Sequence, residues 1–288
     1  MHKELLYQNK KIFYCSEGIG KPVVFIHGFG EDGGVWKNQI EFLKDNLSDD
    51  ETGFNLIFPD LPGSGKSEMI DDMSIEGMAE VIKAILDDSL QKENINTAAS
   101  SKVSPPGGFR GAWVSLIGHS MGGYIVLAFA EKYPEYLKAF GLFHSTAYAE
   151  NEEKKTIRRK GIEFINQHGV SEFLKNITPN LFSSKTKDER PELIDQFING
   201  LNNFSSSALV SYYKAMMQRP DRTNTLKKAT VPVLFIIGEQ DNAVPLQDSL
   251  QQCHLPEKSY IHILHHSGHM GMLEEADTSN RILENFLR

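Results

Sequence analysis

The sequence predicts an α/β protein whose mostly parallel, doubly wound sheet is interrupted by a helical insertion. Continuous apolar runs typical of buried strands alternate with helical patterns over residues 1–146 and again over 230–288. Between them, residues 147–229 contain helical segments and no convincing strand. Neither half of the sheet is complete by itself, so we expect one sheet domain built from both halves, with 147–229 inserted into it.

Local patterns predict each element of the first half. The segments KELLYQ and KIFYCSE flank the turn NK and predict an antiparallel hairpin. Ser74 is the expected N-cap of the helix SIEGMAEVIKAILDDSL, and Pro134 is expected to end the helix GGYIVLAFAEKYP. The other predictions are buried strands at 22–30, 54–60, 112–118 and 137–145 and helices at 35–47, 74–90 and 122–134.

The insertion and the second half continue the pattern. Helices are predicted inside the insertion at 151–169, 170–177, 191–204 and 207–218. After it, strands are predicted at 231–241 and 259–269, and helices at 245–255 and 278–287. One further segment, 93–111, is rich in serine, proline and glycine, and predicts an exposed, mobile loop between a helix and a strand.

The composition limits the possible partners. The 288 residues are 40% hydrophobic, enough for a substantial core, and a formal net charge of −8 argues against nucleic acid as the main partner. Cys15 and Cys253 are too few for a disulfide framework, and MHKELLYQNKK lacks the apolar run of a secretory signal. No apolar run is long enough to predict a membrane span. We therefore expect a cytoplasmic protein with a small-molecule substrate.

The turn DLPGSGKS ends like a nucleotide-binding phosphate loop, but its chemistry disagrees with that function. The pattern G-x-x-x-x-G-K-[ST] requires a glycine where this chain has Asp60. Pro62 removes a backbone N–H from the phosphate cradle, and the following Glu68 would repel a polyphosphate. A turn shaped by proline and glycine after a strand explains the same residues. We therefore predict a structural turn.

The strongest catalytic pattern is LIGHSMGG, which fits G-x-S-x-G with Ser120 at its centre. It lies between a predicted strand and a predicted helix, and such a sharp turn holds the serine in a strained conformation with its Oγ exposed. A tetrahedral intermediate formed on this serine needs oxyanion donors. The first is expected from the backbone N–H of Met121, the residue after the nucleophile.

A serine hydroxyl needs a general base, and the base needs an orienting group. Asp241 follows the predicted strand VPVLFIIG and His269 follows the last predicted strand, so both are expected at the carboxyl edge of the sheet. Glu239 is a weaker candidate than Asp241 because it lies closer to its strand. The predicted catalytic residues are therefore Ser120, Asp241 and His269.

Five segments together resemble the serine-nucleophile branch of the α/β-hydrolase superfamily: HGFG, DLPGSGKS, GHSMGG, GEQDNAVP and SGHMGMLE. The resemblance covers most of the chain and implies the α/β-hydrolase fold, with 147–229 as a helical cap inserted after the sixth strand. It also implies that the backbone N–H of Phe29 is the second oxyanion donor, while His27 and Gly28 shape the turn. The superfamily hosts many reactions, so fold does not settle function.

Two histidine patterns have competing explanations. HILHHSGH contains four histidines, but His265 and His266 are adjacent and would point to opposite faces of a strand. No H-E-x-x-H or paired-cysteine pattern accompanies them, so we expect no metal, and no cofactor is implied. His144 follows a predicted strand and is a candidate for the substrate pocket beneath the cap, against ordinary packing.

These residues predict a serine hydrolase that cleaves a small or medium acyl ester through an acyl-enzyme intermediate, as a carboxylesterase does. A thioesterase or a C–C bond hydrolase could use the same three residues, and GHSMGG does not separate these activities. A non-catalytic ligand-binding protein of the same fold is an alternative from another class, which would be expected to lack one of the three. The sequence leaves the substrate, the oligomeric state and the pocket-lining cap residues open.

Overall fold

The computed structural model describes residues 2–45, 53–97, 114–201 and 204–288. Within these ranges eight strands form one sheet in the order β1-β2-β4-β3-β5-β6-β7-β8. The strands are β1 (His2–Tyr7), β2 (Lys10–Glu17), β3 (Lys21–Ile26), β4 (Phe54–Pro59), β5 (Val114–His119), β6 (Leu137–Phe143), β7 (Val233–Gly238) and β8 (Ser259–Leu264). β2 pairs antiparallel with β1 and β4, and every other pair is parallel. The predicted mostly parallel α/β sheet is confirmed.

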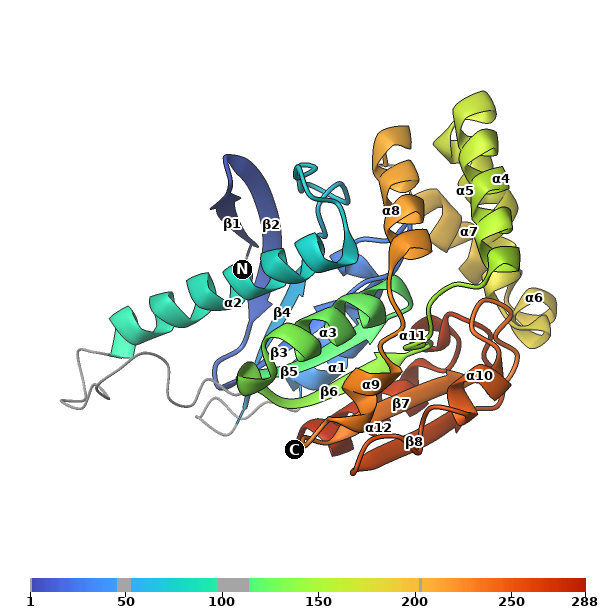
Figure 1. Ribbon diagram of the computed structural model, residues 1–288. Helices are drawn as coiled ribbons and strands as arrows, with labels where there is room; N and C mark the ends of the chain where they lie inside the picture. The colour runs from blue at the N-terminus through green and yellow to red at the C-terminus, as the bar shows by residue number, and fades with distance from the viewer. Residues whose placement is uncertain (1, 46–52, 98–113, 202–203) are drawn as a thin grey trace.

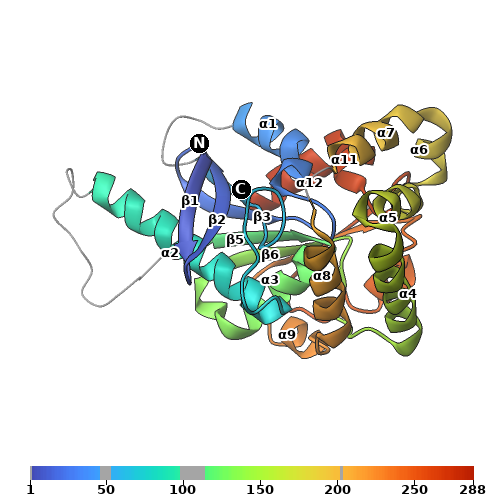
Figure 2. The same cartoon turned by 90° about the horizontal axis from the view of Figure 1, so that it is seen from above.

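Helices cover both faces of the sheet (Figure 1). On one face α2 (Ile75–Thr97) packs against α3 (Met121–Lys132), and on the other α1 (Lys37–Asp45) packs against α12 (Ala276–Leu287). The view from above shows the sheet between these two layers (Figure 2). β5 and β7 are buried at every position, which explains why their sequences are continuously apolar rather than alternating.

The described residues between 147 and 229 are helical or irregular. They form α4 (Glu152–His168), α5 (Val170–Ile177), α6 (Ser184–Glu189), α7 (Pro191–Gly200), α8 (Ser206–Gln218) and α9 (Thr223–Lys227). In both views α4, α5 and α7 stand together beyond one end of the sheet, whereas α9 packs against α3. The division into a core domain and a cap at 147–229 stays a prediction. None of the helices in the described part of the chain has the length and apolarity that a membrane span requires.

Two local predictions need correction. α2 continues to Thr97, because residues 93–97 contain no glycine or proline to interrupt its hydrogen bonding, so they are helical rather than the start of the predicted loop. The rest of that loop, 98–111, lies outside the described residues. The hairpin turn lies one residue earlier than predicted, with Gln8 and Asn9 at φ 49° and 63° between β1 and β2.

The carboxylate of Asp60 accepts hydrogen bonds within and beside the turn DLPGSGKS. Asp60 Oδ2 accepts a hydrogen bond from Lys66 N–H at 3.0 Å, and Oδ1 accepts one from Gly33 N–H at 3.1 Å. A carboxylate therefore occupies the Lys66 backbone donor, which a phosphate loop would direct at its ligand. The hydroxyl of Tyr212, on α8, donates to the carbonyl oxygen of Pro62 at 2.6 Å. The turn thus connects the end of β4 to the helical segment.

Candidate active site

Ser120 occupies a strained turn between β5 and α3. Its backbone has φ 50° and ψ −115°, a conformation that residues other than glycine rarely adopt. A Cβ on Gly118 would lie 2.4 Å from the backbone of Gly122, and one on Gly122 would lie 2.3 Å from the carbonyl oxygen of Ile26. Only glycine at these two positions lets the strand, the turn and the helix approach so closely. The sequence predicts this turn from G-x-S-x-G, and its geometry agrees.

Asp241 and His269 lie together after β7 and β8. His269 Nδ1 donates to Asp241 Oδ2 over 2.7 Å, and Asp241 Oδ1 accepts from the N–H groups of Ala243 and Val244, each at 2.8 Å. Burial raises the pKa of Asp241, but attraction to His269 and hydrogen bonds from His144 and His269 hold that pKa well below its usual range. Asp241 is therefore an anion that keeps the proton on Nδ1 of His269 and leaves Nε2 as the basic nitrogen.

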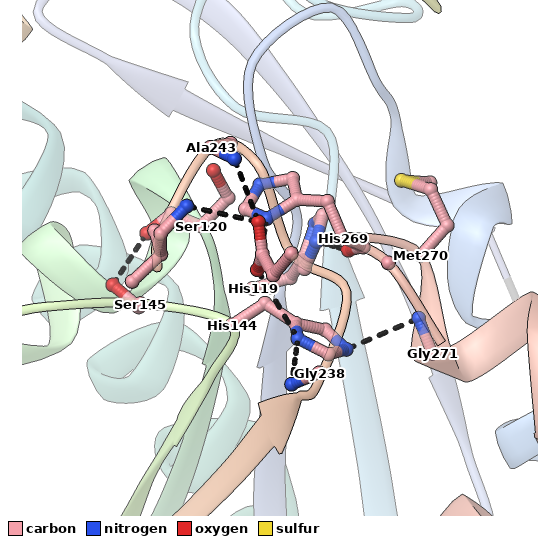
Figure 3. Close-up of polar contacts among 12 residues, drawn as sticks. His119, Ser120, His144, Ser145, Gly238, Ala243, His269, Met270 and Gly271 are labelled. Carbon is pink, nitrogen blue, oxygen red and sulfur yellow. Dashed lines mark hydrogen bonds and ion pairs between the residues drawn. The ribbon is translucent and has the colours of Figure 1, made fainter. Parts of the chain in front are cut away.

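Ser120 and His269 line the same cavity, which has a volume of about 250 Å³ and lies between the strand ends and the helices that follow β6. Figure 3 shows both residues close to His119, with His144 beneath them. Eight apolar residues of the helical insertion line the cavity: Ile157, Leu174, Ile177, Leu181, Phe197, Leu201, Tyr213 and Met216. The sequence showed that these residues are apolar but not which of them face a pocket.

The backbone N–H groups of Phe29 and Met121 are the predicted oxyanion donors. Phe29 follows β3 and lines the cavity with Ser120, and Met121 is the first residue of α3, where helix amides have no partner within the helix. Neither N–H donates to another protein atom in the described ranges. Both amides therefore lack a protein acceptor among the described residues, and their role as an oxyanion hole stays a prediction.

A buried ion pair that the sequence analysis missed supports the loop of Phe29. Glu31 Oε2 accepts from Gly28 N–H at 2.7 Å and from His119 Nδ1 at 3.0 Å, and His119 Nε2 donates to the His269 carbonyl at 2.9 Å. A carboxylate and a carbonyl only accept, so both ring nitrogens of His119 carry protons. Burial opposes both charges, but their mutual attraction leaves the pKa of Glu31 lowered and the pKa of His119 raised.

His144 lies outside the cavity, which corrects the expectation that it lines the substrate pocket. It follows β6 at φ 50° and is 1% exposed. Its Nδ1 contacts Gly238 N–H at 3.0 Å and Asp241 Oδ2 at 3.4 Å, and its Nε2 accepts from Gly271 N–H at 3.1 Å (Figure 3). Burial lowers its pKa, so the ring is neutral. Packing between the loops of Asp241 and His269 leaves it no face for a substrate.

The histidine-rich end of β8 has an ordinary structural explanation. His265 is exposed and its Nδ1 lies 3.0 Å from Glu239, so Glu239 pairs with His265 rather than with His269. Across the residues that the structure describes, no group of three or more His, Cys, Asp or Glu side chains could hold a metal ion. Asp241 is therefore the carboxylate of this site.

Comparison with known proteins identifies the family. Residues 23–281 match the family described as "Alpha/beta hydrolase family". The chain belongs to this family. One curated relative, 2-hydroxy-6-oxononadienedioate/2-hydroxy-6-oxononatrienedioate hydrolase 1 of Pseudomonas putida, is 25% identical over 283 residues, covering 95% of this chain and 90% of that protein. Another, 2-hydroxy-6-oxo-6-phenylhexa-2,4-dienoate hydrolase of Comamonas testosteroni, is 27% identical over 291 residues, covering 96% and 91%.

Solved structures agree with the α/β-hydrolase fold. A thermophilic esterase from Thermogutta terrifontis matches with a TM-score of 0.82 at 24% identity, covering 100% of this chain and 98% of that one. An enol-lactonase from Burkholderia xenovorans LB400 matches with a TM-score of 0.81 at 17% identity, covering 99% of both. At these identities the likeness establishes the fold alone. Family and relatives together make this α/β-hydrolase a hydrolytic enzyme.

Proposed function

We propose that this α/β-hydrolase is a serine hydrolase that cleaves a small or medium acyl ester through an acyl-enzyme intermediate. One observation carries the proposal: Ser120, in its strained turn, shares a cavity with His269, whose Nδ1 is bound by the buried anion Asp241. A nucleophile, a base and a group that orients the base are the parts that acyl transfer requires. The grouping of Ser120 and Asp241 around His269 supports acyl transfer over the ligand-binding alternative.

In the proposed reaction, Ser120 Oγ attacks the ester carbonyl while His269 Nε2 takes its proton. The N–H groups of Phe29 and Met121 bind the oxyanion of the tetrahedral intermediate. His269 then gives its proton to the leaving alkoxide, which departs as an alcohol and leaves the acyl-enzyme. Water attacks the acyl carbon with His269 as base, and the acid leaves Ser120. Asp241 stabilises the imidazolium in both halves, and no step uses a metal or a cofactor.

The size and lining of the cavity support a small or medium acyl group. Its volume of about 250 Å³ lies just below the common range of roughly 300–1,000 Å³ for ligand pockets. Leu174, Phe197 and Met216 give it an apolar wall that suits an acyl chain. From the sequence we further infer that the enzyme acts in the cytoplasm.

A C–C bond hydrolase that uses the same three residues is the second candidate. The names of the curated relatives favour it, because their substrates are hydroxy-oxo-dienoates that contain no ester, so hydrolysis there breaks a C–C bond. The thioesterase alternative has no comparable support. The same base and oxyanion donors serve a ketone carbonyl, so the site geometry fits both candidates.

Hydrolysis of p-nitrophenyl esters of increasing acyl length tests the proposal. We expect the rate to peak at one chain length and to fall by about 10⁶-fold in Ser120→Ala. Ser171→Ala, on the exposed side of α5, is the control and should keep the wild-type rate. Ser120-dependent cleavage of a hydroxy-oxo-dienoate without ester hydrolysis would select the second candidate. A Ser120→Ala protein as fast as wild type on every substrate would refute both.

A further inference from the structure

The cavity has a positively charged wall that the proposed reaction does not use. Arg158, on α4, lines the cavity with a side chain that is 23% exposed. Its Nε donates to both carboxylate oxygens of Glu150, at 2.7 and 2.9 Å, and its Nη2 lies 2.5 Å from Oε1. Arg219, the residue after α8, has its Nη1 3.1 Å from the same oxygen. These three residues are called the arginine cluster below.

The arginine cluster has two cations and one anion. Burial raises the pKa of Glu150, but hydrogen bonds from Arg158 and the attraction of both arginines leave that pKa lowered, so the carboxylate is ionised. The guanidinium carbon of Arg219 lies 3.8 Å from the ring centre of Tyr124, which itself lines the cavity. One positive charge therefore has no counter-charge within the cluster. A charge that is largely removed from water is stabilised when an anion binds beside it.

Arg158 also has a guanidinium nitrogen that no carboxylate contacts. Its contacts with Glu150 engage Nε and Nη2, and within the described residues Nη1 has no carboxylate partner. The guanidinium stands over the ring of Tyr213 at 5.1 Å, and both side chains face the cavity. Among the described residues that line the cavity, the one carboxylate, Glu31, is already paired with His119. It therefore leaves the charge of the arginine cluster uncompensated.

We propose that the arginine cluster recognises a carboxylate at the far end of the substrate's acyl chain, so that the favoured substrates are half-esters of dicarboxylic acids. The guanidinium of Arg158 can donate charge-assisted hydrogen bonds to such a group. The proposal rests on the proposed function, because Ser120 attacks the carbonyl at the other end of the same chain.

The test compares two esters of equal shape. One is p-nitrophenyl hydrogen adipate, and the other is the p-nitrophenyl ester of the branched acid in which an isopropyl group replaces the free carboxylate. Wild type should have the higher kcat/KM on the adipate. In Arg158→Gln the ratio of the two kcat/KM values should fall by about 10- to 100-fold, mainly through KM for the adipate, because one charge-assisted interaction is lost. A ratio unchanged by this substitution overturns the proposal.

Two further variants separate recognition from structural support. Arg158→Lys keeps the charge but not the planar fork, and should retain part of the preference for the adipate. Arg159→Gln removes a neighbouring charge that is 54% exposed and paired with Glu152, and should leave both esters at wild-type rates. If Arg158→Gln unfolds, a loss of preference in the folded Arg158→Lys still supports the proposal, and an undiminished preference there contradicts it.

A binding measurement keeps the two proposals distinguishable. Calorimetry with monomethyl adipate on Ser120→Ala reports recognition without turnover. Binding that weakens about 10-fold or more when Arg158→Gln is added supports the arginine cluster, whether or not either ester is hydrolysed. Absence of hydrolysis of both esters would refute the ester hydrolase and not the arginine cluster. Ser120-dependent hydrolysis with no binding of the carboxylate would refute the arginine cluster alone.

Discussion

The buried pair of Glu31 and His119 allows a sharp test of the electrostatics beside the nucleophile. Glu31→Gln keeps the size of the side chain and removes its negative charge. Glu31 is 3% exposed and His119 is fully buried, so water cannot replace the lost anion. Breaking a buried pair costs about 3–5 kcal/mol. Both hydrogen bonds go to Oε2, and a glutamine oxygen in its place can still accept them, so we expect the free energy of unfolding to fall by about 3 kcal/mol, the lower end of that range.

The same substitution should slow catalysis. Gly28 N–H donates to Glu31 at 2.7 Å and thereby fixes the loop whose next amide is that of Phe29. If the loop moves so far that this oxyanion donor is lost, kcat falls by about 10²- to 10³-fold. KM should change much less, because the apolar wall that would bind the proposed acyl chain comes from other elements.

The effect on stability should depend on pH. The pKa of Glu31 is lowered from its ordinary 4.5, so its contribution is complete above that value and is lost as the pH falls through the lowered pKa. The pKa of His119 is raised from its ordinary 6.5, so its contribution is complete below that value and is lost as the pH rises through the raised pKa. The wild type should therefore exceed the variant most between pH 4.5 and 6.5.

Urea unfolding of four proteins across this pH range provides the assay: wild type, Glu31→Gln, His119→Asn and the double variant. The two single losses should sum to more than the loss in the double variant, because the first substitution already removes the pair. Glu41→Gln is the control. Glu41 is 64% exposed and its ion pair with Lys37 spans 3.8 Å, so removing this pair should change the free energy of unfolding very little. A Glu31→Gln protein as stable as wild type at pH 5.5, or additive losses, would refute the ion pair.

Two other substitutions test connections between the loops. His144→Ala leaves the amide of Gly271, which donates to Nε2 of the neutral ring, without its acceptor. Unfolding free energy should therefore fall by about 1–3 kcal/mol, and kcat should fall with KM retained; an unchanged kcat would exclude a positioning role. Tyr212→Phe removes the hydroxyl that donates to the turn after β4, and should cost about 1–2 kcal/mol in urea unfolding, whereas Tyr260→Phe, at an exposed ring, should cost nothing measurable.

The sheet and the positions of three site residues could be predicted because their signals are local. Buried parallel strands are continuous apolar runs, and each run is bounded by glycine or a polar turn. Ser120 and Asp241 each follow such a run, whereas His269 follows β8, a mostly exposed strand at the edge of the sheet. Parallel strands bring their carboxyl ends to one edge. The contact of Asp241 with His269 then follows from topology, although 28 residues separate them.

Other parts of the site depend on contacts that no local pattern specifies. The Glu31–His119 pair joins residues 88 apart in the chain, and its only sequence signals were a carboxylate after HGFG and a histidine before the serine. His144 was placed correctly at a strand end, but φ 50° turns the chain there so that its ring enters the packing under Asp241. The φ angle of His144 thus determines the side of the strand end to which its ring points, and no sequence pattern specifies this angle.

Positive and negative groups are paired near Ser120, but positive charge is in excess at Arg158, and this affects which substrates can bind. Near Ser120, each carboxylate has a cationic or proton-donating histidine: Glu31 has His119 and Asp241 has His269. The oxyanion region is therefore served by neutral amides, and a substrate carboxylate placed there would meet two buried anions. Among the cavity-lining residues that the structure describes, Arg158 belongs to a cluster with surplus positive charge. A free carboxylate should thus be rejected close to the scissile carbonyl and bound at a distance from it, so that the spacing of the two groups, rather than acidity alone, selects the substrate.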